Sequence, residues 1–149
     1  MIFVGMHTTT SMQDNKTADL WQRFGPRKKE IEERADDNSY SLQLYGPEFL
    51  NETFLPITVF EKWAAVQVNG TSNIPEGMQV LYVSEGQWAV FTYTGTVLDF
   101  GVFAKYIYDS WLPSTGFELD TRPHYESMAP DYLGPMHPEA TEEVWIPIK

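Results

Sequence analysis

The feature that most constrains the fold of this chain is an order of strand and helix patterns that occurs twice in the sequence. In the first half, residues 2–10 are short, β-branched and rich in threonine, which predicts a strand. The stretch "QDNKTADLWQRF" (13–24) then carries helix-capping residues and a helical apolar stripe. Two further stretches, "SYSLQLYG" (39–46) and "FEKWAAVQV" (60–68), have the character of strands. The first half therefore predicts the order strand, helix, strand, strand.

The second half repeats that order. A strand is predicted at about 87–94, within "MQVLYVSEGQWAVFTYTG", and a short strand or loop precedes it. An amphipathic helix follows, and Pro113 and Gly116 end it. Two more strands are predicted at 124–129 and 142–148. The apolar positions of the helix recur with helical spacing: Phe100, Phe103, Ala104, Ile107, Tyr108 and Trp111.

Two units of about equal length, roughly 1–68 and 78–148, indicate an internal duplication. Two such units pack as an antiparallel sheet with both main helices on one side. The sequence thus predicts an α+β fold, and its 149 residues fit a single domain, 1–149.

The charge of the chain argues against direct binding to nucleic acid. The formal net charge is −11 and most of it belongs to residues 51–149, which hold 4 basic and 13 acidic side chains. Such a surface repels a phosphate backbone and attracts cations. No apolar run approaches the roughly 20 residues of a membrane span. The opening "MIFVGMHTTT" lacks the basic region of a signal peptide, so we expect a cytoplasmic protein that does not engage the membrane.

No arrangement of residues predicts a catalytic, metal or cofactor site. The chain has no cysteine, and His7, His124 and His137 are dispersed along it. Phosphate-binding, dinucleotide-binding and serine-nucleophile motifs are all missing from the sequence. Glu142 and Glu143 are adjacent in a strand, so their side chains point apart and do not form an acid–base pair.

The last strand, "EEVWIPI", raises the question of what its carboxylates face. By alternation, Glu142 shares a face with Val144, whereas Glu143 shares the other face with Trp145. If the valine face is the core, Glu142 reaches solvent at the end of the strand and Glu143 points into whatever the other face encloses. A buried, unpaired carboxylate is costly and has a raised pKa, and a cationic ligand relieves that cost.

Aromatic residues are abundant: 5 Trp, 8 Tyr and 9 Phe. Several of them are expected to line a cavity, because tryptophan and tyrosine need a partner for their polar atoms when they are buried. Aromatic rings beside a carboxylate favour lipophilic cations, since each good cation–π contact contributes roughly 0.5–2 kcal/mol.

Several stretches in a fixed order resemble the GyrI-like, or AraC-type, effector-binding domain. They are "QWAVFTYTG" before a helix, "WLPSTGFELDTRPHYE" after it and the closing "EEVWIPI", while "LWQRF" and "YSLQLYG" fit the first half. Trp88 stands where the family usually has tyrosine, and Thr115 where serine is common. The resemblance covers nearly the whole chain.

This resemblance implies a central groove between the two repeats, where hydrophobic and often cationic small molecules bind against a glutamate of the last strand. The motif places that glutamate at Glu143, in agreement with the alternation. The residues expected to form the aromatic walls are Tyr45, Trp63, Trp88, Trp111, Trp145, Tyr108 and Phe24. Many family members also carry a helix-turn-helix domain, and this chain resembles the effector domain alone.

Three functions remain open from the sequence. The first is a module that binds lipophilic cations as a sensor or sequestering protein, with a role in transcriptional regulation. The second is a hydrolase of electrophilic small molecules, in which burial raises the pKa of Glu143. The third is an acidic regulator that docks on a protein partner, as a DNA mimic does.

Overall fold

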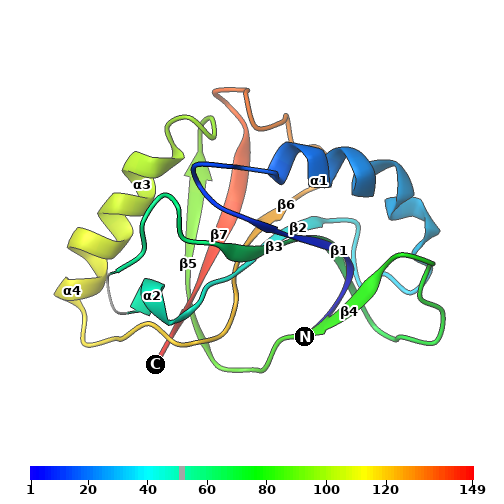
Figure 1. Cartoon of the computed structure of the whole chain (residues 1–149), viewed down its shortest axis with the longest axis horizontal. Coiled ribbons are helices and arrows are strands. Elements are labelled where there is room, and N and C mark those ends of the chain that lie inside the picture. The colour runs from blue at the N-terminus through cyan, green and yellow to red at the C-terminus, as the bar shows by residue number, and fades with distance from the viewer. Residues whose placement is uncertain (51–52) are drawn as a thin grey trace.

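The computed structural model describes residues 1–50 and 53–149 and has an α+β fold, as the sequence predicts (Figure 1). The strands are β1 (Ile2–Thr10), β2 (Ser39–Leu44), β3 (Phe60–Val68), β4 (Gln79–Tyr82), β5 (Gln87–Thr94), β6 (His124–Met128) and β7 (Thr141–Ile148). The helices are α1 (Thr17–Phe24) with a 3₁₀ extension (Gly25–Glu30), α2 (Pro47–Leu50), α3 (Phe100–Tyr106) with a π-helical continuation (Ile107–Trp111), and α4 (Leu112–Ser114).

The strands form one antiparallel sheet of seven, in the order β4-β1-β3-β2-β6-β7-β5. Apart from the additional edge strand β4, this order reads the same from either side of the boundary between β2 and β6. The group β1-β3-β2 corresponds to β5-β7-β6, and α1 corresponds to α3. This pseudo-twofold arrangement is what the repeated order of elements leads one to expect, while the duplication itself stays a prediction.

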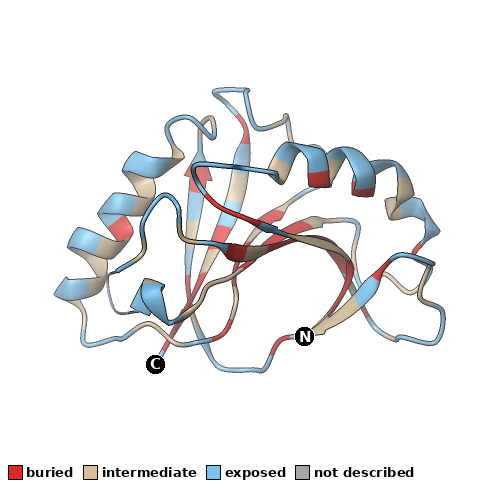
Figure 2. Cartoon of the chain, in the orientation of Figure 1, coloured by how far each residue is buried: buried red, intermediate tan, exposed pale blue. Residues whose placement is uncertain are grey.

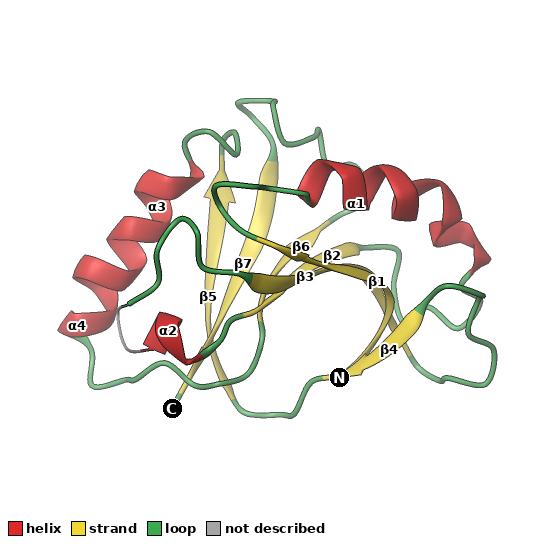
Figure 3. Cartoon of the chain, in the orientation of Figure 1, coloured by secondary structure: helices red, strands yellow, loops and turns green. Residues whose placement is uncertain are grey.

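Both main helices cover the same face of the sheet, which we call the helix face (Figure 3). Under α1, Leu20 and Phe24 pack on Val4 and Val66, and all four are fully buried. Under α3, a second cluster includes Ile107, Phe103, Val144 and Ile146. The two clusters lie on one face because Ala64, Ser41, Glu126 and Val144 are successive cross-strand partners from β3 to β7.

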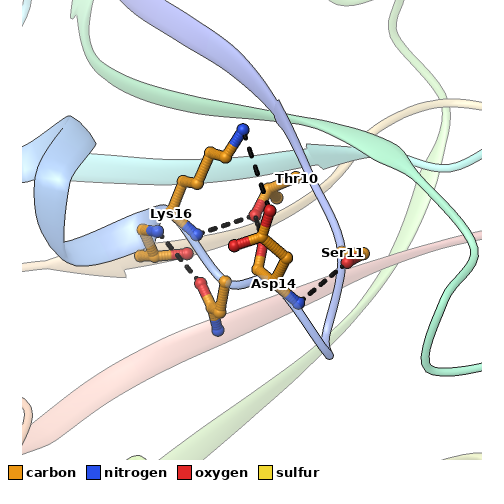
Figure 4. Close-up of polar contacts among 6 residues, drawn as sticks. Thr10, Ser11, Asp14 and Lys16 are labelled. Atoms are coloured by element: carbon orange, nitrogen blue, oxygen red, sulfur yellow. Dashed lines mark hydrogen bonds and ion pairs between the residues drawn. The ribbon is translucent and has the colours of Figure 1, made fainter.

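The connection from β1 to α1 is held by side chain–backbone hydrogen bonds (Figure 4). The Thr10 hydroxyl donates to the Asp14 carbonyl at 3.1 Å and accepts from the Lys16 amide at 2.8 Å, and the Asp14 amide donates to the Ser11 hydroxyl at 3.0 Å. The Thr17 amide donates to Asn15 Oδ1 at 2.9 Å. The bonds from the Lys16 and Thr17 amides satisfy donors that the start of the helix leaves free.

Two features of the helices differ from the simplest expectation. Residues 47–50 form the short helix α2, which the sequence patterns do not predict. The helix that begins at Phe100 changes to π-helical geometry at Ile107 before it ends at Ser114. A π-helical turn widens the helix and redirects the side chains that follow it.

The sheet must curl, because its two edge strands follow one another in the sequence. Only residues 83–86 separate β4 from β5, and such a link spans at most about 18 Å. The edges of a flat sheet of seven strands lie about 29 Å apart. Val83, Leu81 of β4 and Trp88 of β5 all belong to one apolar cluster on the face without helices, so the sheet curls toward that face.

The buried residues follow the central strands, whereas the outward surfaces of the helices are exposed (Figure 2). In the part of the chain that the structure describes, no helix has the length and apolar character needed to cross a membrane.

Candidate functional site

Four residues form a row across the middle of the helix-free face, one from each central strand. Trp63 of β3 pairs with Leu42 of β2, Leu42 pairs with Tyr125 of β6, and Tyr125 pairs with Trp145 of β7. Trp63, Leu42 and Tyr125 are buried and Trp145 is partly buried. The row is therefore part of the core of the curled sheet, although no helix covers it.

At the β7 end of the row, three large rings pack closely. Tyr125 and Trp145 are stacked with their centroids 5.2 Å apart, and Trp88 meets each of them edge to face, at 5.3 and 5.8 Å. The guanidinium of Arg122 lies 4.3 Å from the centroid of Trp88. One ring of this group thus already holds a cation, which agrees with the attraction of indole faces for positive charge.

The same short motif, Glu-x-Trp, occupies both ends of the row. The indole N–H of Trp145 donates to Glu143 Oε1 at 3.3 Å. The indole N–H of Trp63 donates to Glu61 Oε1 at 2.5 Å. In each repeat, the last strand therefore presents a carboxylate that is joined to a tryptophan two residues later.

The structure corrects the expected environment of Glu143. It confirms that Glu143 shares a face with Trp145, but Glu143 is exposed and has the tryptophan as a partner, so the expectation of a dry, unpaired carboxylate is wrong. Its cross-strand neighbours, Thr92 and Ser127, have short side chains.

The structure separates the predicted site residues into two faces. Glu143, Trp145, Trp63 and Trp88 belong together on the helix-free face. The remaining residues lie on the helix face in three different places: Phe24 under α1, Trp111 against Phe91 under α3, and Tyr45 with Tyr108 near α2. That any of these residues contacts a ligand stays a prediction.

Tyr45 and Tyr108 belong to a ring cluster around His124 on the helix face. Tyr45 lies edge to face with His124 at 5.0 Å, and the Tyr108 hydroxyl is 3.0 Å from His124 Nδ1. Burial lowers the pKa of His124 to about 3, so this imidazole is neutral. A cavity of about 250 Å³ lies beside the cluster, and its lining includes Phe49 of α2 and Arg122.

Next to this cluster, three charged groups are enclosed on the helix face. Burial lowers the pKa of Lys62, and the nearby carboxyl groups of Glu126 and Glu142 oppose that effect. Burial raises the pKa of Glu126, which Lys62 and a hydrogen bond from Gln43 at 3.3 Å counteract. Burial and then the charge of Glu126 raise the pKa of Glu142 to about 7. Glu142 is half-buried, so it reaches solvent at the strand end only in part.

Sequence reasoning missed Lys62, Glu126 and Glu61. Alternation along β3 places Lys62 with Ala64 and Val66, which marks a lysine on a core face and would have indicated the buried charges. Alignment of the two repeats would have matched Glu61-x-Trp63 with Glu143-x-Trp145 and so indicated a second carboxylate.

Within residues 1–50 and 53–149, no group of three or more His, Asp or Glu side chains could hold a metal ion. At the β7 end of the row, the exposed carboxylate of Glu143 lies beside the partly buried ring of Trp145. A carboxylate next to an aromatic ring attracts positive charge.

The chain is similar in sequence to a known protein. Transcriptional regulator BrlR of Pseudomonas aeruginosa is 30% identical over 146 residues, which are 97% of this chain and 51% of BrlR. The chain thus spans about half the length of that relative.

Two solved structures share the fold over the whole chain. SAV2435 bound to tetraphenylphosphonium has a TM-score of 0.70 at 15% identity, with 88% of its chain covered. An integron cassette protein of Vibrio cholerae has a TM-score of 0.63 at 16% identity, with 90% covered. The model of the GyrI-like small molecule binding domain matches residues 1–149. The chain therefore belongs to the GyrI-like family of small-molecule-binding domains.

Proposed function

We propose that this chain binds lipophilic cations on its helix-free face and acts as a sensor or sequestering protein for them. The observation that carries the proposal is the arrangement at the end of β7. There an exposed carboxylate, Glu143, accepts the indole N–H of Trp145, and Trp145 stacks on Tyr125 beside Trp88. A cation at this point meets opposite charge and aromatic faces together.

The comparisons support the class of ligand. SAV2435, which has the same fold, is known in complex with tetraphenylphosphonium, a lipophilic cation. BrlR is a transcriptional regulator, and its length is about twice the region that this chain matches. A role in transcription would require a further domain or a partner that reads the bound state.

The two alternatives from the sequence receive no comparable support. The hydrolase hypothesis relied on a buried Glu143 acting as acid or base, and Glu143 is exposed. The DNA-mimic hypothesis relies on surface acidity alone, and no feature of the described residues singles out a docking surface for it.

The test is calorimetric titration with tetraphenylphosphonium, with triphenylphosphine oxide as a neutral compound of similar shape. We expect Glu143→Gln to weaken cation binding about tenfold, which corresponds to about 1.4 kcal/mol, and to leave any binding of the neutral compound unchanged. Higher ionic strength should weaken cation binding to the wild type more than to the variant.

Glu118→Gln is the matched control, because Glu118 is also exposed and the variant changes the net charge equally. Equal affinities for tetraphenylphosphonium in the wild type and Glu143→Gln would contradict the proposal. So would an equal loss of affinity in both variants, since the effect would then be one of overall charge.

A further inference from the structure

We propose that the helix-free face carries a second cation half-site at Glu61 and Trp63, and that the face therefore prefers elongated molecules with a positive centre at each end. The inference rests on the proposed function, because it assumes that Glu143 and Trp145 form the first half-site.

The two half-sites are equivalent by the pseudo-twofold arrangement of the sheet. Trp63 and Trp145 end the same four-residue row, in β3 and β7. Each indole N–H donates to the carboxylate two residues before it, Glu61 or Glu143. Since the two strands run in opposite directions, the two glutamates lie on opposite sides of the row, each two residues along its strand.

The Glu61 half-site already holds a basic ring. The imidazole of His7 is stacked on Trp63, with centroids 4.6 Å apart and planes 20° apart. His7 Nδ1 lies 3.2 Å from Glu61 Oε1, and its Nε2 lies 2.7 Å from Gln79 Oε1. The side chains of His7 and Glu61 keep 34% and 38% of their exposure, so both are accessible to a ligand. The contacts of His7 show which chemistry fits there: a flat nitrogen ring that lies on the indole and meets the carboxylate.

The spacing of the half-sites sets the length of the ligand. Three strand intervals separate β3 from β7, about 14 Å, and each glutamate lies two residues beyond the row, about 7 Å. On a flat sheet the two glutamate Cα atoms would be roughly 20 Å apart. The side chains point to the side toward which the sheet curls, so the carboxylates lie closer together than that. A ligand with two cationic rings joined by a long flexible chain matches this distance.

His7 competes with the second cation. The imidazole of His7 covers one face of the Trp63 ring, and Trp63 as a whole is only 3% exposed. The imidazole also contacts the carboxylate of Glu61, which the second cation would bind. Removal of the imidazole therefore exposes the ring and frees Glu61. The proposal predicts a gain of affinity for two-headed cations in His7→Ala, which a purely structural role of His7 would not produce.

The experiment compares dequalinium, which has two aminoquinaldinium rings on one alkyl chain, with decyl-aminoquinaldinium, which has a single such ring. Affinities are measured by calorimetry for the wild type and for Glu61→Gln, Glu143→Gln, His7→Ala and the control Glu118→Gln. We expect the wild type to bind the two-headed probe at least tenfold more tightly. Glu61→Gln should remove about tenfold of the affinity for dequalinium alone, and Glu143→Gln should weaken both probes. His7→Ala should strengthen dequalinium binding severalfold.

The outcomes separate this inference from the proposed function. If the single-headed probe binds at Glu143 but Glu61→Gln leaves dequalinium affinity unchanged, or weakens both probes equally, the second half-site is refuted and the first stands. If neither probe binds the wild type, the proposed function fails and the inference fails with it. If Glu61→Gln does not fold, the dequalinium affinity of His7→Ala is the test. If that variant binds dequalinium no more tightly than the wild type does, the second half-site is refuted.

Discussion

The two faces of the sheet place similar charged residues in opposite environments. On the helix face, Lys62 is buried and Glu126 and Glu142 are partly buried, and burial shifts the pKa of each. On the helix-free face, Glu61 and Glu143 keep access to solvent, and each accepts a tryptophan N–H. One step along a strand, from Glu142 to Glu143, leads from a partly buried carboxyl group to an exposed one.

This difference indicates a division of roles between the faces. A buried charge must be balanced by another charge inside the protein, so the charges of Lys62, Glu126 and Glu142 depend on one another. An accessible carboxylate beside an aromatic face is free to meet a charge from outside. Substitutions on the helix face should therefore change the stability of the fold, whereas those on the helix-free face should change binding.

The largest effect is expected for Lys62→Met, which removes the positive charge among the enclosed groups. At pH 8 the free energy of unfolding should fall by about 3 kcal/mol, because the carboxylates of Glu126 and Glu142 are left buried without a counter-charge. At pH 5 the loss should be smaller, since both carboxyl groups have raised pKa values and take up protons. Urea unfolding at the two pH values measures the difference.

Lys105→Met is the control for that experiment. Lys105 is exposed on α3 and pairs with Asp109 at 2.7 Å, so its removal should leave the free energy of unfolding nearly unchanged at either pH. A Lys62→Met protein as stable as the wild type at pH 8 would show that the enclosed charges do not depend on one another.

The fold was predictable because its signals are local and repeated. Alternation placed β1, β2, β3 and β7 close to their observed bounds, and the helical stripe from Phe100 to Trp111 gave α3 with its continuation. The pairing of the repeats followed from the order of elements and from the family resemblance. Helix α2 has four residues, too few to show a period of 3.6, so its sequence gave no helical signal.

The site was predictable only in part. Alternation correctly grouped Glu143 with Trp145, because the side-chain period of a strand is fixed. Exposure depends on what packs above a face, and no pattern within β7 describes the residues that cover Glu142 or leave Glu143 open. Alternation also separates Tyr45 from Trp63, because Tyr45 is three residues from Leu42, the partner of Trp63. That Tyr108 joins Tyr45 at His124 depends on tertiary packing, which no local pattern describes.

The second effect in size concerns Glu142→Gln. Burial raises the pKa of Glu142 from its usual value near 4.5 to about 7, so its proton is held more tightly in the folded protein. Its contribution to stability is complete below about pH 4.5 and is lost as the pH rises through 7. The groups that face it from the packed elements are Glu126, Lys62, Tyr93 and Tyr132.

The glutamine variant is always neutral, so it should be more stable than the wild type by about 2 kcal/mol at pH 8 and equal to it near pH 4.5. This value is reduced from the full pKa shift because Glu142 keeps some contact with solvent. Thermal unfolding across this pH range measures the difference, with Glu118→Gln as a control that should show none. A constant difference at all pH values would mean that Glu142 is not the group that titrates.

The smallest effect should come from Glu143→Gln in the absence of ligand, and it is the sharpest test of the comparison. Glu143 is exposed, and the hydrogen bond that it accepts from the Trp145 indole N–H is long, at 3.3 Å. A glutamine amide oxygen can accept that bond equally well. Its unfolding free energy should therefore differ from that of the wild type by less than about 0.5 kcal/mol between pH 4.5 and 8. A stabilisation as large as that expected for Glu142→Gln would show that the helix-free face also encloses its carboxylates. A small change, together with a loss of cation affinity, would mean that this carboxylate serves binding and not the fold.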